Sequence, residues 1–159
     1  MVLRSCRRRA AIFATLGALS LVAAGCSDDD GDETGATGGG TTVDVTLQEF
    51  AVIPASSSAP AGDVTFDVTN EGPDDTHEFV VFKTDLAPDA LPTVADGSVD
   101  EEGEGLELID EIEDIAVGDA PTLTVSLDAG SYVFICNIYD EAEQEAHYQE
   151  GMRVAFTVE

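Results

Sequence analysis

The chain has 159 residues, which fits a single domain, and 43 % of them are hydrophobic, which is enough to build a core. Acidic residues outnumber basic ones by 33 to 6, and the formal net charge is −27. Nucleic acids are bound by basic surfaces, so this charge excludes a nucleic-acid partner. It leaves cations and basic proteins as partners, and three cysteines are too few for a disulfide-rich scaffold.

The first 25 residues are typical of an export signal. A basic start with Arg4 and Arg7-Arg8-Arg9 is followed by an apolar run of 15 residues, Ala10 to Ala24. A membrane-spanning helix needs about 20 residues, so this run is short for one. The run ends in Ala23-Ala24-Gly25-Cys26, which resembles a bacterial lipobox. We therefore expect Cys26 to be lipidated and to become the mature N-terminus; the alternative is an ordinary cleaved signal with a chance cysteine.

Removing residues 1–25 takes away four of the six basic residues and no acidic ones, and Lys83 and Arg153 remain. Residues 26–42 consist of the lipidated cysteine and a segment of Asp, Gly and Thr with almost nothing apolar, which predicts a flexible acidic linker. Residues 43–159 are the domain proper. We expect an exported, monomeric protein that is held at the outer face of the cell membrane by the lipid anchor only.

The domain is expected to consist of short strands separated by turn residues. Apolar and polar residues alternate in 43–47, 64–68, 123–127 and 153–158, and the stretches 77–82 and 132–138 are nearly continuously apolar. Turns are indicated at Pro60-Ala61-Gly62, Asn70-Glu71-Gly72-Pro73 and Ala129-Gly130. Six strands with this patterning predict an all-β fold, an antiparallel Greek-key β-sandwich.

A strongly acidic insertion interrupts this pattern, with ten acidic residues among the nineteen from Asp96 to Asp114. Such a run usually forms a solvated surface. Three apolar residues lie at helical spacing in and directly after it, so a short amphipathic helix could cover the sandwich here: Leu108, Ile112 and Ile115. Asp96, Ser98 and Asp100 have the spacing of a calcium loop, but Glu101 stands where that loop requires glycine, which favours a solvated insertion.

The residues that bind soft metals are scarce, and their order along the domain is informative. Cys136 ends an apolar stretch, His147 and Met152 follow it in the order Cys-x10-His-x4-Met, and His77 begins another strand. A thiolate, two imidazoles and a weak thioether are the ligands of a type 1 copper centre. Taken singly, each of these residues could belong to the core. Zinc suits the thiolate and the imidazoles but not the thioether.

Two stretches resemble the cupredoxins, the plastocyanin- and azurin-like blue copper proteins. The first is Asn70 to Phe79, which leads to a histidine, and the second is Gly130 to Met152, which ends in His-x4-Met with glycine before the methionine. The resemblance covers 43–159 and implies a cupredoxin-like sandwich that binds one type 1 copper ion. It implies that His77, Cys136 and His147 are the three equatorial ligands. Met152 would be the axial ligand.

The chain departs from the family pattern at two points. Ten residues separate Cys136 from His147, where many cupredoxins have only a few. Glu78 follows the first histidine, where the family often has an asparagine that helps to tie the ligand strands together.

The resemblance implies a carrier of single electrons rather than an enzyme. Four acidic residues near His147 predict a basic redox protein as partner and a salt-sensitive association: Glu141, Glu143, Glu145 and Glu150. An envelope copper-binding or chaperone protein without a redox role is the alternative, and the long ligand loop favours it. A metal-free sandwich used for adhesion or assembly is a third reading. The two histidines leave none for a Ser-His-Asp triad or for further copper ions, so we expect no enzymatic activity.

Overall fold

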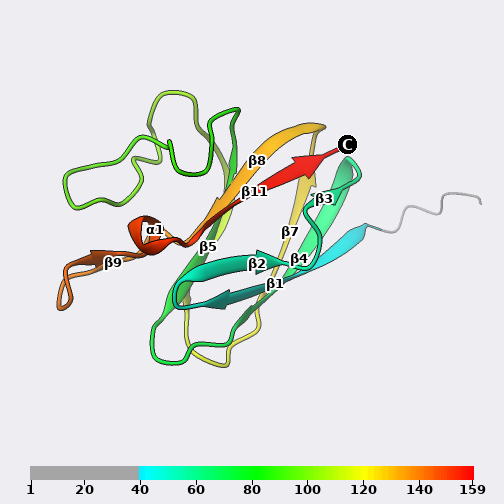
Figure 1. Ribbon diagram of the computed structural model, residues 1–159. Helices are drawn as coiled ribbons and strands as arrows, with labels where there is room; N and C mark the ends of the chain where they lie inside the picture. The colour runs from blue at the N-terminus through cyan, green and yellow to red at the C-terminus, as the bar shows by residue number, and fades with distance from the viewer. Residues whose placement is uncertain (1–39) are drawn as a thin grey trace, which may run out of the picture. The chain divides into compact units, whose positions relative to one another are not determined.

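The computed structural model describes residues 40–159; the expected export signal, Cys26 and most of the linker lie outside the described residues. Two β-sheets pack face to face (Figure 1). The first contains, in spatial order, β2 (Ala51–Pro54), β1 (Thr41–Gln48), β4 (Gly62–Asn70) and β7 (Thr122–Leu127). The second contains β3 (Ser58–Ala59), β11 (Arg153–Val158), β8 (Gly130–Ile135), β5 (His77–Lys83) and β6 (Glu107–Ile115). This is the all-β sandwich that the strand pattern predicts.

The two sheets are mixed rather than wholly antiparallel. β1 runs parallel to β4, and β11 runs parallel to β3, whereas the other strand pairs within the two sheets are antiparallel. The chain between β1 and β4 forms the short strands β2 and β3. It thereby returns to the end of the sheet at which β1 begins, and β4 starts there. The expectation of antiparallel pairing throughout is therefore wrong at these two positions.

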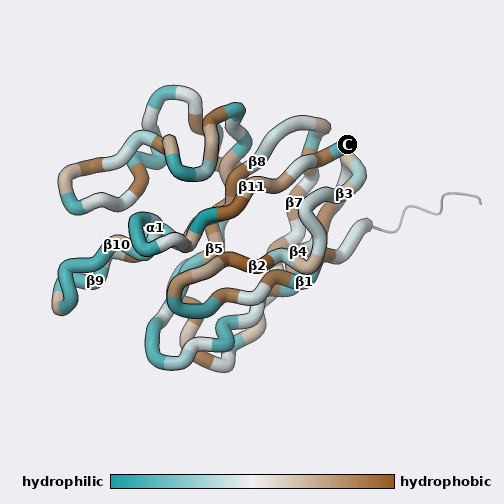
Figure 2. The backbone as a smooth tube through the Cα atoms, viewed as in Figure 1, coloured by the Kyte–Doolittle hydropathy of each residue, from teal (hydrophilic) through white to brown (hydrophobic). Residues whose placement is uncertain are grey.

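The core between the sheets is built around four phenylalanines with ring centroids 4.7–6.0 Å apart: Phe66, Phe79, Phe134 and Phe156. Each comes from the inward face of a strand, and burying such a ring stabilises the fold by about 1.5–3 kcal/mol. Figure 2 shows hydrophobic stretches along the central strands and hydrophilic residues around β9. The alternating patterns in the sequence thus place their apolar residues inside the sandwich.

The acidic insertion contains a strand and not the expected helix. Residues 107–115 form β6, which pairs antiparallel with β5 at the edge of the second sheet. Every β5 residue except Glu78 and Lys83 is fully buried, so its edge needs hydrogen-bond partners, and β6 supplies them. Leu108 is 40 % exposed and Ile115 is buried, so the helical spacing of these apolar residues has no counterpart in the structure. β6 is an edge strand rich in acidic side chains, and charge on an edge strand disfavours pairing with other chains.

Residues 84–106 form a long irregular segment that covers the outer face of the second sheet (Figure 1, upper left). Leu91 and Val99 from this segment join a second apolar cluster with side chains of β5 and β8: Val80, Phe82, Val133 and Ile135, together with Tyr148. β5 and β8 are therefore buried on both faces, which explains why their sequences are almost continuously apolar.

β8 ends at Ile135, earlier than the apolar stretch predicted, and the chain then leaves the sheet. The following segment forms a hairpin of β9 (Tyr139–Asp140) and β10 (Glu145–Ala146), and then the single helical turn α1 (His147–Glu150). Figure 1 shows this hairpin projecting from the sandwich beside α1. Within residues 40–159, no helix has the length and apolar character needed to cross a membrane.

Candidate metal centre

Three side chains that can ligate a metal meet at one end of the sandwich. His77 is the first residue of β5, Cys136 follows the last residue of β8, and His147 opens α1. Their exposed fractions are 0 %, 0 % and 2 %. Among the residues that the structure describes, this is the one group of three or more His, Cys, Asp or Glu side chains placed to hold a metal ion.

The three donor atoms form a compact triangle. Nδ1 of His77 lies 3.2 Å from Nδ1 of His147, and Sγ of Cys136 lies 3.4 Å from Nδ1 of His147 and 3.9 Å from Nδ1 of His77. The centre of such a triangle is about 2 Å from each corner, which is close to the length of metal bonds to imidazole nitrogen, about 2.0–2.1 Å, and slightly shorter than those to thiolate sulfur, about 2.3 Å. The donor set and its geometry fit one small ion in trigonal coordination.

Backbone hydrogen bonds hold the ligand segments together. The antiparallel register of β5 and β8 brings the N–H of Glu78 to within 3.3 Å of Sγ of Cys136, to which it donates. The N–H of Cys136 donates to the carbonyl of Met152 at 3.1 Å, and the N–H of Met152 donates to the carbonyl of His147 at 3.0 Å. The positions of the three ligand-bearing segments are therefore linked to one another.

Met152 is fully buried, and its side chain belongs to the same core cluster as Cys136. The backbone bonds just described fix it between the two segments that carry the thiol and the second imidazole. Its role as the axial ligand stays a prediction.

Burial sets the protonation of the metal-free centre. It raises the pKa of the Cys136 thiol to about 12, against the opposing effect of the N–H groups of residues 78 and 138. It also lowers the pKa of His77, with a further contribution from His147, and it lowers the pKa of His147 itself. At neutral pH both imidazoles are uncharged and the thiol is protonated, so a metal ion has to displace the thiol proton.

Glu78 makes the tie that the family often assigns to asparagine. Its Oε1 accepts a hydrogen bond of 2.7 Å from the backbone N–H of Asn137, the residue after Cys136. Burial raises the pKa of Glu78 to about 7, the hydrogen bond from Asn137 opposes this shift, and neighbouring acidic residues add to it. The departure at this position therefore preserves the link between the strand of the first histidine and the segment of the cysteine.

The long segment 84–106 braces both sides of the ligand loop. Asn137 accepts a hydrogen bond from the N–H of Val99 at 2.6 Å and donates one to the carbonyl of Val99 at 3.1 Å. The hydroxyl of Tyr148, which follows His147, donates to the carbonyl of Pro88 at 2.8 Å and accepts from the N–H of Leu91 at 3.2 Å. The residues that directly follow Cys136 and His147 are thus both anchored, which the sequence did not indicate.

The turn between β1 and β2 closes the centre from the other side. The ring of Phe50 packs edge-on against the ring of His147, with centroids 5.2 Å apart. Oε1 of Glu49 accepts hydrogen bonds from the N–H groups of Asp74 and Asp75 at 3.0 and 2.6 Å, and it lies 3.7 Å from Nε2 of His77. Sequence reasoning missed both residues, because they are far from the ligands along the chain and belong to no ligand motif.

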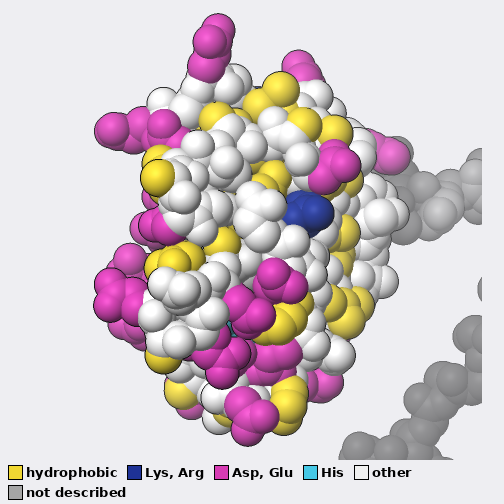
Figure 3. Space-filling view, turned by 60° about the vertical axis from the view of Figure 1, so that its left-hand side comes forward, with side chains coloured by type: hydrophobic (Ala, Val, Ile, Leu, Met, Phe, Trp, Pro, Cys, Tyr) yellow, Lys and Arg dark blue, Asp and Glu magenta, His cyan; other side chains and the backbone are white. Residues whose placement is uncertain are grey.

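Acidic side chains gather on the surface around this end of the molecule, as Figure 3 shows with the side that carries β9 and α1 turned toward the viewer. Glu141, Glu143 and Glu150 are exposed, and Glu145 is partly exposed. His147 itself is covered, so a partner would meet this acidic rim and the residues that cover the ring rather than the imidazole.

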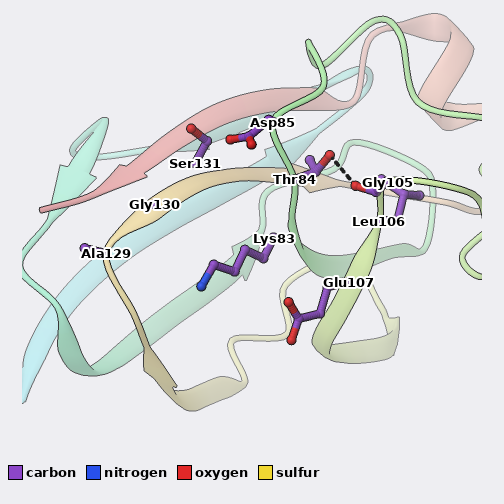
Figure 4. A pocket seen from close by; sticks show the side chains of 9 residues that line it. All are labelled: Lys83, Thr84, Asp85, Gly105, Leu106, Glu107, Ala129, Gly130 and Ser131. Atoms are coloured by element: carbon purple, nitrogen blue, oxygen red, sulfur yellow. Dashed lines mark hydrogen bonds between the residues drawn. The ribbon is translucent and has the colours of Figure 1, made fainter.

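An open cavity of about 470 Å³ lies at the opposite end of β5 and β8 (Figure 4). Lys83, the last residue of β5, and Gly130, the first of β8, line it together with Asp85 and Glu107. Thr84 donates a hydrogen bond of 2.8 Å to the carbonyl of Gly105 in its wall. One basic and two acidic side chains line the cavity, without a cluster of ligating side chains, so we assign it no function.

No protein-family model matches the sequence, and no curated protein matches it. The structure is similar to the dithionite-reduced auracyanin of Roseiflexus castenholzii, with a TM-score of 0.53, 23 % identity, and coverage of 77 % of this chain and 99 % of that one. It is also similar to auracyanin A, a blue copper protein of Chloroflexus aurantiacus, with a TM-score of 0.51, 18 % identity, and coverage of 76 % and 100 %. The cupredoxin-like fold predicted from the sequence is confirmed.

Proposed function

We propose that the protein is a type 1 copper protein that carries single electrons between redox partners and has no enzymatic activity. The observation that carries this proposal is the buried triangle of two Nδ1 atoms and one Sγ atom around a point about 2 Å from each. When bound there, copper would supply the one-electron couple Cu(II)/Cu(I). The similarity in fold to two auracyanins, one of them described as a blue copper protein, supports the same reading.

Each of the four proposed ligands has a separate role in this site. Cys136 provides the thiolate, His77 and His147 provide neutral imidazoles, and Met152 is the proposed axial thioether. Because the equatorial donors are buried and the segments that carry them are joined by hydrogen bonds, their positions change little when one electron is added or removed. The covering residues also keep water away from the thiolate.

The alternative is an envelope copper-binding or chaperone protein without a redox role, and the long ligand loop favoured it. Such a protein has to release its metal readily. The contacts of Asn137 and Tyr148 with segment 84–106 count against easy release, because they hold the residues that directly follow Cys136 and His147. We therefore favour the electron carrier.

The proposed setting is outside the cell, at the outer face of the cell membrane, with a lipid on Cys26 as the anchor. The lipobox-like Ala23-Ala24-Gly25-Cys26 supports this location. Cell fractionation tests it: the protein should sediment with membranes, and a Cys26→Ala variant should leave the membrane fraction. A Cys26→Ala variant that stays membrane-bound would contradict the lipid anchor.

The proposed partner of the monomer is a basic redox protein, because acidic side chains surround the end that holds the ligands. Reduction by a basic cytochrome should slow as the ionic strength rises, since salt screens the attraction between exposed charges. A rate indifferent to ionic strength would contradict this partner.

Titration of the purified protein with Cu(II), followed by visible absorption, tests the site itself. One equivalent should produce an intense thiolate-to-copper charge-transfer band, and Cys136→Ser should abolish it. Reversible one-electron reduction should bleach the band without loss of the metal. The absence of an intense band in the unaltered protein would overturn the proposal.

A further inference from the structure

Two buried polar atoms beside the metal centre have no hydrogen-bond partner, and they belong to neighbouring side chains. They are Oε2 of Glu49 and Nε2 of His77. The Glu49 side chain is only 13 % exposed, and its other oxygen lies 3.7 Å from Nε2 of His77. Buried polar atoms without partners cost free energy, so a pair of this kind needs an explanation.

The two nitrogens of the His77 ring face different surroundings. Nδ1 points to the other donors of the metal triangle, Nδ1 of His147 and Sγ of Cys136. Nε2 points to the carboxylate of Glu49. A neutral imidazole carries one proton. A proton on Nε2 would face the carboxylate of Glu49. A proton on Nδ1 would instead leave the Nε2 lone pair facing the negative charge of that carboxylate.

We propose that Glu49 is a positioning residue: its carboxylate shortens the 3.7 Å separation to Nε2 of His77, accepts the Nε2–H, and so turns the Nδ1 lone pair toward the metal. The backbone N–H groups of Asp74 and Asp75 hold the carboxylate in place, because both donate to its Oε1. His147 is then the donor in the Nδ1–Nδ1 contact of the metal-free protein, and it has to move its proton when a metal binds. This inference rests on the proposed copper site.

The charge of Glu49 has a second consequence. A carboxylate next to a ligand stabilises the more positive state of the site, which is the one with Cu(II). An outer carboxylate that fixes a ligating histidine typically contributes 10- to 100-fold to metal affinity. Glu49→Gln should therefore weaken Cu(II) binding by at least about tenfold and lower the ratio of Cu(II) to Cu(I) affinity by about tenfold, which raises the reduction potential by about 59 mV for one electron.

The first test needs no metal. The protein has two histidines, so ¹⁵N spectra of the unaltered, metal-free protein contain two imidazole rings, and a His147 variant assigns them. His77 should carry its proton on Nε2, and His147 should carry its proton on Nδ1. A His77 proton on Nδ1 would overturn the inference. This measurement decides the matter even if Glu49→Gln fails to fold.

The second test compares Glu49→Gln with Glu71→Gln, which removes an exposed charge from the loop that precedes His77. The first variant should show the weaker Cu(II) binding and the higher potential, and the second should match the unaltered protein. Equal values in the two variants would overturn the role of Glu49. Failure of the unaltered protein to give the intense copper band would instead overturn the proposed function, and the ¹⁵N result would still decide how Glu49 and His77 interact.

Discussion

The two ends of the β5–β8 strand pair differ in almost every physical respect. At one end, His77 and Cys136 are fully buried and joined to their surroundings by hydrogen bonds of backbone and side chain. At the other end, Lys83 and Gly130 border an open cavity, and the charge nearest to Lys83 is that of Asp128, whose side chain is 94 % exposed.

This difference shows why an open cavity is a poor guide to function in this molecule. The candidate metal centre is closed because its donor side chains are buried and the turn that carries Glu49 and Phe50 covers them. Burial shifts the pKa values of Cys136, His77 and Glu78 at this end. The candidate functional residues stand out by the convergence of their donor atoms and by their desolvation.

The largest expected effect is the pH dependence of copper binding at the closed end. The pKa of the Cys136 thiol is raised to about 12, whereas those of both histidines are lowered, so between pH 7 and 9 the metal displaces one proton, from sulfur. Copper affinity should rise about tenfold per pH unit over this range. Competition titrations with a chelator of known affinity measure this slope, and a flat profile would mean that the thiol is already ionised.

Glu78→Gln should stabilise the metal-free protein relative to the unaltered one, and this difference should grow as the pH rises. The pKa of Glu78 is raised in the folded state to about 7, so ionising it between pH 4.5 and 7 weakens the fold, and glutamine escapes this loss while still accepting the N–H of Asn137. The gain in free energy of unfolding should grow by about 1–3 kcal/mol between pH 5 and pH 8.

Denaturant unfolding at several pH values measures this gain. The control is Glu107→Gln, which removes a carboxylate that is exposed, at the open end of the molecule. A gain for Glu78→Gln that does not change with pH would contradict the desolvation of this side chain.

Two tyrosines give a paired test of the contacts between segment 84–106 and the residues next to the ligands. Tyr148 and Tyr132 are both buried and both donate to a backbone carbonyl at 2.8 Å, but Tyr148 lies beside His147 and Tyr132 lies toward the open end, with its hydroxyl bound to Asp128. Replacing Tyr132 with phenylalanine should cost about 1 kcal/mol of stability, and replacing Tyr148 about 1–3 kcal/mol, because its hydroxyl makes two hydrogen bonds.

Only Tyr148→Phe should speed the transfer of copper to a chelator, by about five- to tenfold, because it releases one end of the ligand loop and leaves the N–H of Leu91 unpaired. Stopped-flow measurements on both variants give the comparison. Equal transfer rates would mean that segment 84–106 does not hold the metal site.

The smallest effect is expected at the open end. Lys83→Gln removes an ion pair of 3.9 Å with an exposed partner, and such pairs contribute little. The free energy of unfolding should change by less than about 0.5 kcal/mol, and the copper spectrum should not change. A loss of copper binding in this variant would contradict the independence of the two ends.

The sequence predicted what depends on local pattern and rare residue types. Alternation placed Val43, Val45 and Leu47 in the core, and the order of His77, Cys136 and His147 identified three side chains that the fold brings together. The predicted helix at Leu108 failed because the need of β5 for an edge partner lies outside the local sequence.

The residues that surround the ligands could not be predicted for a similar reason. Glu49 and Phe50 come from a turn that carries no ligand motif, and their meeting with His77 and His147 depends on how the first sheet packs on the second. The sequence shows Glu78 at the position where cupredoxins often have asparagine. Its hydrogen bond with Asn137 could not be predicted, because that bond depends on the register of β5 against β8.

The central claim is that one copper ion lies between two imidazoles and the thiolate at the closed end. X-ray absorption at the copper edge, on the purified protein loaded with one equivalent, tests it most directly. The account predicts two nitrogen scatterers and one sulfur scatterer at about 2.0–2.3 Å. A first shell of oxygen and nitrogen without sulfur would place the metal on the acidic surface and contradict the account.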